Sequence, residues 1–341
     1  MFASFLQRVE DGKVLTRAEA EQIMEEILSG SVQTPEIVRL LRGMSARPVQ
    51  SQELVGFASV MRRHAAPVFT KEKLRPPNLL DTCGTGGDGC ETFNISTAAA
   101  IVASAAGACV AKHGNRASSS RCGSADVLEA LGVRVDISLQ RAGECIREVG
   151  LGFLFAPTAH AAARHAAPAR KEIGVRTVFN LLGPLTNPAG AHSQVVGVYS
   201  AAVLELIGET LKELGIQRAF VVHGADGLDE ISLSGETHVI ELRDRQTRHF
   251  TVTPEDFGIA RASLETLRGG NDTENAALIE RVLNGEPGPR RDITVMNAAA
   301  ALVTAGLAKD FCSGAKMAAD AISSGAAKEK LVALVAFTNK I

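Results

Sequence analysis

The sequence lacks an excess of charge of either sign. Its 341 residues include 36 Lys and Arg and 38 Asp and Glu, which give a formal net charge of −2 at pH 7. A chain without a broad basic field does not recruit nucleic acid or an anionic membrane through its net charge. Any affinity for phosphate must therefore come from a local site.

The sequence also lacks the short motifs of zinc hydrolases and of enzymes with an activated nucleophile. It contains no Cys-x-x-Cys and no His-Glu-x-x-His, and no Ser/His/Asp or Cys/His arrangement is evident. Zinc hydrolysis and covalent nucleophilic catalysis are therefore disfavoured. Six cysteines without metal-ligand spacing are typical of reduced thiols in a cytoplasmic protein, and these are Cys83, Cys90, Cys109, Cys122, Cys145 and Cys312.

Long apolar runs are absent as well. The first ten residues, Met1–Glu10, hold too short an apolar run for a signal sequence. The longest run, around Ala98–Ala111, is interrupted by Ser104 and Gly107 and falls short of the roughly 20 residues of a membrane span. We therefore expect a soluble protein, and an apolar content of 45% allows a substantial core.

The first seventy residues show the apolar spacing of helices. The segment Thr16–Glu19 reads as a capping box, in which a hydroxyl and a carboxylate satisfy backbone N–H groups at the start of a helix. Apolar residues at helical spacing follow up to Gly30, and two further helices are predicted after Pro35 and over residues 52–64. Residues 67–77 are predicted to form a linker.

Beyond Leu79, short apolar runs alternate with helical patterns. This alternation predicts an α/β domain with a central, mainly parallel sheet flanked by helices. We expect a small all-helical domain over residues 1–75 and a larger α/β domain over residues 76–341. The predicted strands cover residues 79–82, 108–111, 152–155, 194–199, 219–223 and 237–241, and the predicted helices cover residues 97–106, 124–131, 139–148, 159–171, 202–214 and 273–283.

One segment, Thr177–Pro188, breaks this alternation. Its Gly-Pro and Asn-Pro pairs are typical of a short helix that ends in a turn. We expect residues near 170–190 to pack on the N-terminal helices and to complete the helical domain.

A glycine-rich loop follows the first predicted strand. Four glycines between Gly84 and Gly89 let backbone N–H groups approach an anion without obstruction by a Cβ atom. The spacing differs from that of a Walker P-loop or a Rossmann fingerprint. Asp88 within the loop would repel a bare phosphate, which favours a contact with a sugar hydroxyl or with a metal ion that the phosphate carries.

Two further polar segments follow the loop. Asn94–Thr97 precedes an alanine-rich helix, and Ser96 or Thr97 is predicted to cap it beside N–H groups that can bind an anion. Lys112–Ser120 then brings a lysine, an arginine and three serines to the end of a strand, which indicates a cradle for a polyanion. His113 can stabilise charge there, although a lone histidine is more often structural.

Adjacent carboxylates, Asp229 and Glu230, stand just beyond another predicted strand and its glycine-containing turn. Oxygen ligands of this kind suit a hard cation such as Mg²⁺. An arginine that faces a cleft can bind a carboxylate through two hydrogen bonds. The spacing leaves Arg164, Arg170 and Arg176 as alternatives for that role.

Taken together, these segments closely resemble the anthranilate phosphoribosyltransferase family. The resemblance covers nearly the whole chain, and its most specific parts are residues 84–88, 94–97, 112–126, 176–188 and 227–232. It implies a homodimeric, Mg²⁺-dependent glycosyltransferase of tryptophan biosynthesis. Such an enzyme transfers the phosphoribosyl group of 5-phosphoribosyl 1-diphosphate (PRPP) to the amine of anthranilate and releases diphosphate.

The resemblance also implies roles for individual residues. It places Arg170 at the anthranilate carboxylate, beside Gly84 and Asn115, and it assigns magnesium to Ser96, Asp229 and Glu230. Ala161 follows His160 where the family commonly has a proline, so the sequence departs from the pattern at the anthranilate entrance. The residues implied to contact PRPP are Gly84, Gly87, Asp88, Thr92, Asn94, Ile95, Ser96, Thr97, Lys112, His113, Gly114, Asn115, Arg116, Ala117, Ser118, Ser119, Ser120 and Ser124.

No residue stands out as a general acid or base, so we expect positioning and electrostatic stabilisation of the leaving diphosphate to provide catalysis. Two alternatives stay open. A pyrimidine nucleoside phosphorylase shares the Lys112–Asp126 pattern but lacks the acid pair. A non-catalytic relative that binds nucleic acid would show a basic face and an eroded acid pair, and the sequence has neither.

Overall fold

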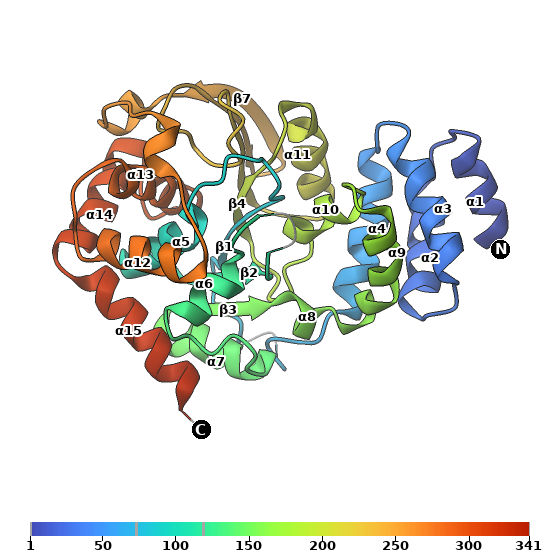
Figure 1. Ribbon diagram of the computed structural model, residues 1–341, viewed down its shortest axis with the longest axis horizontal. Coiled ribbons are helices and arrows are strands. Elements are labelled where there is room, and N and C mark those ends of the chain that lie inside the picture. The colour runs from blue at the N-terminus through green and yellow to red at the C-terminus, as the bar shows by residue number, and fades with distance from the viewer. Residues whose placement is uncertain (1, 72–73, 118–119, 341) are drawn as a thin grey trace.

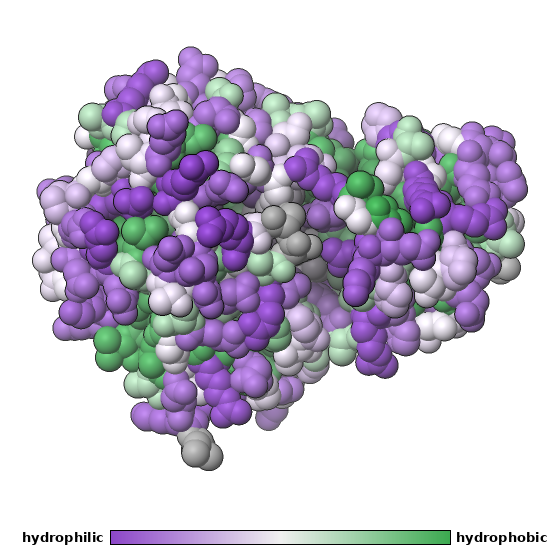
Figure 2. All heavy atoms as spheres, in the orientation of Figure 1, coloured by the Kyte–Doolittle hydropathy of each residue, from purple (hydrophilic) through white to green (hydrophobic). Residues whose placement is uncertain are grey.

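The computed structural model describes residues 2–71, 74–117 and 120–340. Figure 1 shows a small helical domain beside a larger domain that contains the sheet. On the face seen in Figure 2, hydrophilic residues predominate and hydrophobic residues are scattered among them. In the part of the chain that the structure describes, no helix combines the length and the apolar character needed to cross a membrane.

The helical domain begins with four helices, and the predicted capping box is confirmed at the second. The Thr16 Oγ1 atom accepts the Glu19 N–H at 3.3 Å, and the Glu19 carboxylate accepts the Thr16 N–H at 2.8 Å. Apolar faces of the four helices, including Ile23, Leu41 and Phe57, share one buried cluster. The helices are α1 (Phe2–Glu10), α2 (Arg17–Leu28), α3 (Thr34–Ser45) and α4 (Ser51–His64).

The larger domain is built on one seven-stranded sheet, in the order β3-β2-β1-β4-β5-β6-β7. The first five strands of that order pair in parallel, and β6 and β7 are antiparallel, which confirms the mainly parallel sheet. The strands are β1 (Leu80–Gly84), β2 (Val110–Gly114), β3 (Leu151–Phe155), β4 (Ser193–Gly197), β5 (Arg218–Gly224), β6 (Thr237–Arg243) and β7 (Gln246–Val252).

The sequence did not predict β7, because this edge strand is largely exposed and mostly polar. The other six strands were predicted with small shifts of their ends. The largest shift is at β2, which continues through Lys112 and His113 to Gly114. These polar side chains are buried by tertiary contacts, and a pattern of apolar residues does not reveal that.

Helices pack on both faces of the sheet (Figure 1). The alanine-rich α5 lies against α13 in the centre of one apolar cluster, where small side chains allow close approach. On the other face, α11 shares the cluster of the N-terminal helices. The longer helices of this domain are α5 (Ile95–Ala105), α6 (Ser124–Ala130), α7 (Leu139–Val149), α11 (Leu204–Glu213), α12 (Asp272–Leu283), α13 (Pro289–Thr304), α14 (Phe311–Ser323) and α15 (Ala326–Asn339).

The prediction of one helix over residues 159–171 is wrong. The chain instead forms α8 (Ala156–Ala159), a 3₁₀ helix (Ala161–Ala166) and α9 (Ala167–Ile173). Pro168 lies in the first turn of α9. Because proline has no N–H, it cannot continue a helical hydrogen-bond ladder from upstream, and the helix starts anew there.

The segment that breaks the strand–helix alternation forms α10 (Phe179–Leu182) and a 3₁₀ turn (Gly183–Leu185). Its apolar side chains share the cluster of the N-terminal helices, and α10 contacts α4. The same cluster continues into β4 and β5 through Val196 and Val221. A domain boundary at residues 75/76, with residues near 170–190 completing the helical domain, therefore stays a proposal.

Candidate active site at the carboxyl edge of the sheet

Four neighbouring parallel strands end on glycine at the same edge of the sheet, which is where α/β proteins commonly bind ligands. A Cβ atom at Gly197, the end of β4, would lie 1.5 Å from the carbonyl oxygen of Asp229. One at Gly84, the end of β1, would lie 2.9 Å from the Asp229 Oδ2 atom. Glycine at these positions therefore lets the loop after β5 rest directly on β1 and β4.

Gly197 is a position at this edge that the sequence analysis missed. It ends a Val-Val-Gly run inside a predicted strand, and a glycine in a strand often marks a close backbone approach. That signal was present, but the partner of the approach lies on a distant loop.

The acid pair contacts the glycine loop and the start of α5, although these segments are far apart in sequence. The Gly86 N–H donates to Asp229 Oδ2 at 3.0 Å across 143 residues of sequence. The Asp229 N–H donates to Asp88 Oδ2 at 3.3 Å, and the Ser96 N–H donates to Glu230 Oε1 at 3.0 Å. Asp88, Ser96, Asp229 and Glu230 thus form one cluster, as the resemblance implied for the last three.

Burial and mutual repulsion perturb these carboxylates. Burial raises the pKa of Asp229 to about 7, and the neighbouring Asp88 acts in the same direction. Burial and then the charge of Asp229 raise the pKa of Glu230 to about 8. Such a gathering of oxygen ligands is stabilised by a cation.

Among residues 2–71, 74–117 and 120–340, no group of three or more His, Cys, Asp and Glu side chains is arranged to hold a metal ion by itself. Mg²⁺ commonly binds one or two protein carboxylates and takes its other ligands from water and substrate phosphates. The cluster of Asp229 and Glu230 with Ser96 therefore fits a magnesium ion that shares its ligands with a phosphorylated substrate.

Lys112 lies beneath this cluster and is not a solvated surface charge. Its side chain is only 3% exposed, and its Nζ atom donates to the Thr82 carbonyl at 2.6 Å and to Ser96 Oγ at 3.3 Å. Burial lowers the pKa of Lys112, and the nearby Asp81 opposes that shift. The ammonium group therefore links β2 to β1 and to the first turn of α5.

The sequence analysis missed a network of buried polar groups that connects the strands beneath the acid cluster. The Asp81 carboxylate accepts the His113 N–H at 3.1 Å and the Asn187 side-chain amide at 2.8 Å. The same amide donates to the Ala111 carbonyl at 2.8 Å. The network joins β1, β2 and the segment after α10, and only the Asn-Pro pair at Asn187 hinted at it.

His113 takes the structural role rather than a charged one. Its ring lies edge-on to that of His160, with ring centroids 5.2 Å apart. Burial, and then His160, lower the pKa of His113 to about 3. The imidazole is therefore neutral near pH 7, and the suggestion that it stabilises charge as a cation is not supported.

The prediction that Ser96 or Thr97 caps α5 is wrong. The helix begins at Ile95, and Asn94 is the N-cap residue. The side-chain amide of Asn94 does not cap the helix, because it donates to the Cys122 carbonyl at 3.1 Å and accepts from Asn275 at 3.0 Å. The Ser96 N–H is used by Glu230, so this helix start is only partly free for an anion.

The described part of the segment Lys112–Ser120 is less open than a polyanion cradle would be. Arg116 forms ion pairs with Asp126 and Glu129, at 3.1 Å and 2.8 Å, so its charge is already neutralised. The Ala117 N–H also donates to Asp126 at 2.8 Å. Other implied contacts lie nearby: Ser124 Oγ donates to the Asn115 carbonyl at 3.3 Å, and Ser120 Oγ donates to the Cys122 carbonyl at 3.4 Å.

The remaining implied PRPP contacts are dispersed. Ile95 and Thr97 are buried in the domain core, and Thr92 forms an isolated bridge with Arg268. Gly87 faces the guanidinium of Arg176, while Gly114 is held against Ser124. Ser118 and Ser119 lie outside the described residues.

The three candidate arginines occupy different positions. The Arg176 guanidinium donates to the Gly87 carbonyl and lies 4.3 Å from the centroid of the Tyr199 ring. Arg170, on α9, is exposed and lies 5.2 Å from the centroid of the Phe179 ring. Arg164 is exposed on the 3₁₀ helix. Of these three arginines, Arg176 contacts the glycine loop.

Comparisons with known proteins identify the family. The helical bundle domain of the glycosyl transferase family matches residues 3–65, and the α/β domain of that family matches residues 76–328. A relative from Pelotomaculum thermopropionicum is 49% identical over 341 residues, which cover 100% of this chain and 98% of the relative. It is named anthranilate phosphoribosyltransferase. This chain belongs to the anthranilate phosphoribosyltransferase family.

Other members of the anthranilate phosphoribosyltransferase family agree in sequence and in fold. The relative from Desulfatibacillum aliphaticivorans is 48% identical, over 100% of this chain and 99% of its own length. The crystal structure from Thermus thermophilus has a TM-score of 0.92 at 45% identity, covering 98% of this chain and 99% of that one. The Saccharomyces cerevisiae enzyme in complex with PRPP and Mg has a TM-score of 0.90 at 27% identity, covering 100% and 98%.

These matches confirm the predicted family and fold class. Because full-length relatives at 45–49% identity carry the anthranilate phosphoribosyltransferase name, the assignment to a pyrimidine nucleoside phosphorylase is not favoured. The matches do not assign individual residues, so the site residues stay predictions.

Proposed function

We propose that this chain transfers the phosphoribosyl group of PRPP to the amine of anthranilate, giving N-(5-phosphoribosyl)anthranilate and diphosphate in tryptophan biosynthesis. The observation that carries the proposal is the cluster of Asp88, Asp229 and Glu230 against the glycine loop. It lies at the sheet edge of a chain that is 49% identical to an enzyme of that name.

The proposal includes Mg²⁺, which is present with PRPP in the yeast relative. Ser96, Asp229 and Glu230 would hold the ion, and the raised pKa values of the two acids support a cationic partner there. When bound, Mg²⁺ neutralises charge on the leaving diphosphate.

The chain's own groups would bind and orient the two substrates. Backbone N–H groups around Gly84 and Gly87 suit the diphosphate, while Asn115 and Arg170 would contact anthranilate, with Arg170 at its carboxylate. The bond from C1 to the diphosphate oxygen breaks and a bond from C1 to the amine nitrogen forms. The nitrogen then releases its proton to solvent, so no side chain has to act as a general base.

Arg116 has a specific place in this proposal. For its guanidinium to contact PRPP, as the resemblance implies, it would have to exchange Asp126 and Glu129 for phosphate oxygens. Such an exchange keeps the arginine paired in both states, so its charge is never left without a counter-ion.

We further propose that the enzyme is a cytoplasmic homodimer that acts on small molecules and binds neither nucleic acid nor membrane. The net charge of −2 supports the proposed absence of binding to nucleic acid and membrane. Six free thiols suit a reducing compartment.

The test follows the loss of anthranilate fluorescence in the presence of PRPP. We expect the loss only when the chain, PRPP and Mg²⁺ are all present, and we expect the chelator EDTA to stop it. A parallel assay measures phosphorolysis of thymidine. Turnover of thymidine without turnover of anthranilate would overturn the proposal.

A further inference from the structure

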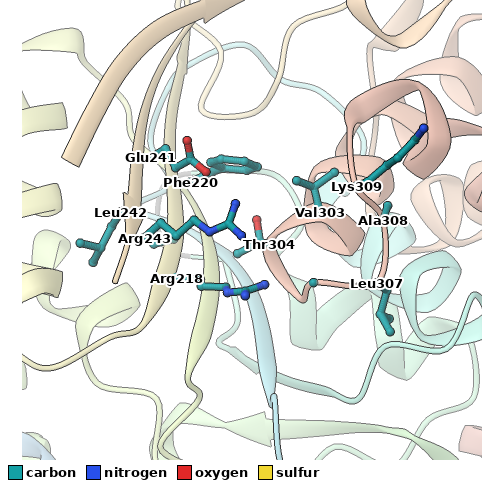
Figure 3. A pocket seen from close by; sticks show the side chains of 12 residues that line it. Arg218, Phe220, Glu241, Leu242, Arg243, Val303, Thr304, Leu307, Ala308 and Lys309 are labelled. Atoms are coloured by element: carbon teal, nitrogen blue, oxygen red, sulfur yellow. The ribbon is translucent and has the colours of Figure 1, made fainter. Parts of the chain in front are cut away.

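A cavity lies at the amino end of the sheet, and Figure 3 shows the side chains that line it. It has a volume of about 420 Å³ and is enclosed by the start of β5, the end of β6 and the chain that leaves α13. The strand β5 begins at Arg218 in this cavity and reaches the candidate active site only at Gly224. The two sites therefore lie at opposite ends of the same strand.

Four side chains from two paired strands form one wall of the cavity. Arg218 of β5 lies directly opposite Arg243 of β6, and Phe220 lies directly opposite Glu241. Because side chains alternate across a strand, these four point to the same face of the sheet. Figure 3 shows both guanidinium groups directed toward the chain that leaves α13.

The two arginines form a like-charged pair, and among the described residues only Arg243 has a carboxylate within ion-pair distance. Like charges directly opposite each other on paired strands are destabilising. In the part of the chain that the structure describes, no carboxylate lies within 4.0 Å of the Arg218 guanidinium. Arg243 approaches only the exposed Asp244, at 4.0 Å. A carboxylate placed between the two guanidinium groups would relieve their repulsion.

The opposite charge is also present in the cavity. Glu241 contributes a carboxylate to the same wall. The C-terminal end of α13, at Thr304, lines the cavity and carries the partial negative charge of the helix dipole. These two groups suit an ammonium group, while Lys309, which also lines the cavity, is paired with Asp310 at 3.8 Å.

Apolar surface completes the cavity. Phe220, Val303 and Leu307 line it beside the charged groups. Leu307 is one of the few large hydrophobic side chains that are strongly exposed, at 45%. Covering it with a ligand would remove apolar area from water, which is favourable.

We propose that this cavity binds a zwitterionic α-amino acid with an apolar side chain. Arg218 and Arg243 hold the carboxylate, Glu241 and the end of α13 face the ammonium group, and the apolar side chain covers Leu307 and Val303. The volume is within the range of pockets that enclose small ligands, roughly 300–1,000 Å³. The proposal does not depend on the proposed transferase activity, because the cavity is a separate binding site.

The experiment uses free tryptophan as the probe. The chain contains no tryptophan, so indole fluorescence belongs to the added ligand alone. We expect its anisotropy to rise to saturation with one site per chain, and we expect leucine to compete. Tryptamine, which lacks the carboxylate, and indole-3-propionate, which lacks the ammonium group, should each bind about tenfold more weakly or worse.

Matched variants locate the site. Arg218→Gln and Arg243→Gln should each weaken tryptophan binding about tenfold. Arg245→Gln, an arginine of the β6–β7 turn that does not line the cavity, should leave binding unchanged. Asp229→Asn, at the other end of the sheet, should also leave it unchanged.

Three results would overturn the proposal. These are no saturable binding at millimolar tryptophan, binding that persists in both cavity variants, and displacement by sodium acetate or inorganic phosphate as readily as by leucine. Thermal melts accompany each variant. Removing one arginine of the like-charged pair should keep or raise the melting temperature, and the exposed Arg243 provides the test if Arg218→Gln does not fold.

Discussion

The two ends of the sheet gather opposite charges. At the carboxyl edge, Asp88, Asp229 and Glu230 come together from two loops, and at the amino edge Arg218 and Arg243 face each other on paired strands. In both places the fold holds like charges close together although their repulsion is unfavourable. The difference is in how they are held: loops hold the acids, whereas strands hold the arginines. Like charges that the fold holds close together therefore mark where a ligand of the opposite charge is expected.

The variant with the largest expected effect removes both carboxylates of the acid pair at the carboxyl edge. Asp229→Ala combined with Glu230→Ala should lower turnover of anthranilate about a thousandfold, because a bound metal ion contributes several kcal/mol to stabilising transition-state charge. The anthranilate fluorescence assay measures the effect at saturating Mg²⁺.

The isosteric pair Asp229→Asn and Glu230→Gln is the control for folding, together with circular dichroism. A well-folded double variant with near-normal turnover would contradict the metal assignment. Binding of tryptophan at the amino edge should be the same in both double variants, which separates the two ends.

Next in size is the effect of Arg170→Ala. We expect the Michaelis constant for anthranilate to rise about 30-fold, while the constant for PRPP changes little, because a charged hydrogen bond contributes roughly 1.5–3 kcal/mol. Steady-state kinetics with each substrate varied in turn gives both constants. Lys171→Ala, the adjacent exposed cation on α9, is the matched control, and equal changes in the two constants for Arg170→Ala would exclude the carboxylate role.

A pH series tests the neutral His113 beneath the acid cluster. The pKa of His113 is about 3 in the folded chain and about 6.5 when it is unfolded. Between these values the unfolded chain binds more protons at this histidine, so the contribution of His113 to the free energy of unfolding is fully present above pH 6.5 and falls as the pH drops toward 3. The raised pKa values of Asp229 and Glu230 act in the opposite direction, so the His113 contribution is obtained as the difference between the parent chain and a His113 variant. At pH 5 the contribution of His113 should be about 2 kcal/mol smaller than at pH 8.

Urea unfolding at each pH measures this dependence. His113→Gln should remove its contribution and so change the slope, whereas His249→Gln, at an exposed position on β7, should leave the slope as it is. A slope that is the same in the parent chain and in His113→Gln would show that other groups cause the acid sensitivity.

The smallest expected effect concerns the contact between Arg176 and the Gly87 carbonyl. Arg176→Gln should raise the Michaelis constant for PRPP about fivefold, because one hydrogen bond and one cation–π contact contribute about 1 kcal/mol. Arg164→Gln provides the comparison at an exposed site outside the loop. If the two variants behave alike, the contact does not position the glycine loop.

Local patterns predicted most of the frame of this protein. Apolar runs located six strands, and the capping box located α2, because these features depend on neighbouring residues. The prediction of a single helix over residues 159–171 was wrong at Pro168. Proline has no N–H to continue the helical hydrogen bonds, although the apolar spacing continues past it. The edge strand β7 was missed because an exposed strand does not need an apolar face.

The sequence suggested which residues belong to the candidate site, but it did not predict which of them contact one another. The resemblance placed the glycine loop and the acid pair at one site, and the hydrogen bonds that join them span more than a hundred residues. The same distance in sequence hid the Asp81–Asn187 bond. Arg116 looked free in the sequence, because ion pairs with residues 10 and 13 positions later depend on how the loop folds back.

The bare backbone at Gly197 has a consequence for redesign of this protein. The Asp229 carbonyl rests on β4 with no side chain between them. The distance between β4 and the loop after β5 is therefore set by the main chain alone, and no change of side-chain rotamer can adjust it. Any residue larger than glycine would move the whole acid-bearing loop as one piece. Redesign of the candidate site therefore has very little room for substitution at the end of β4.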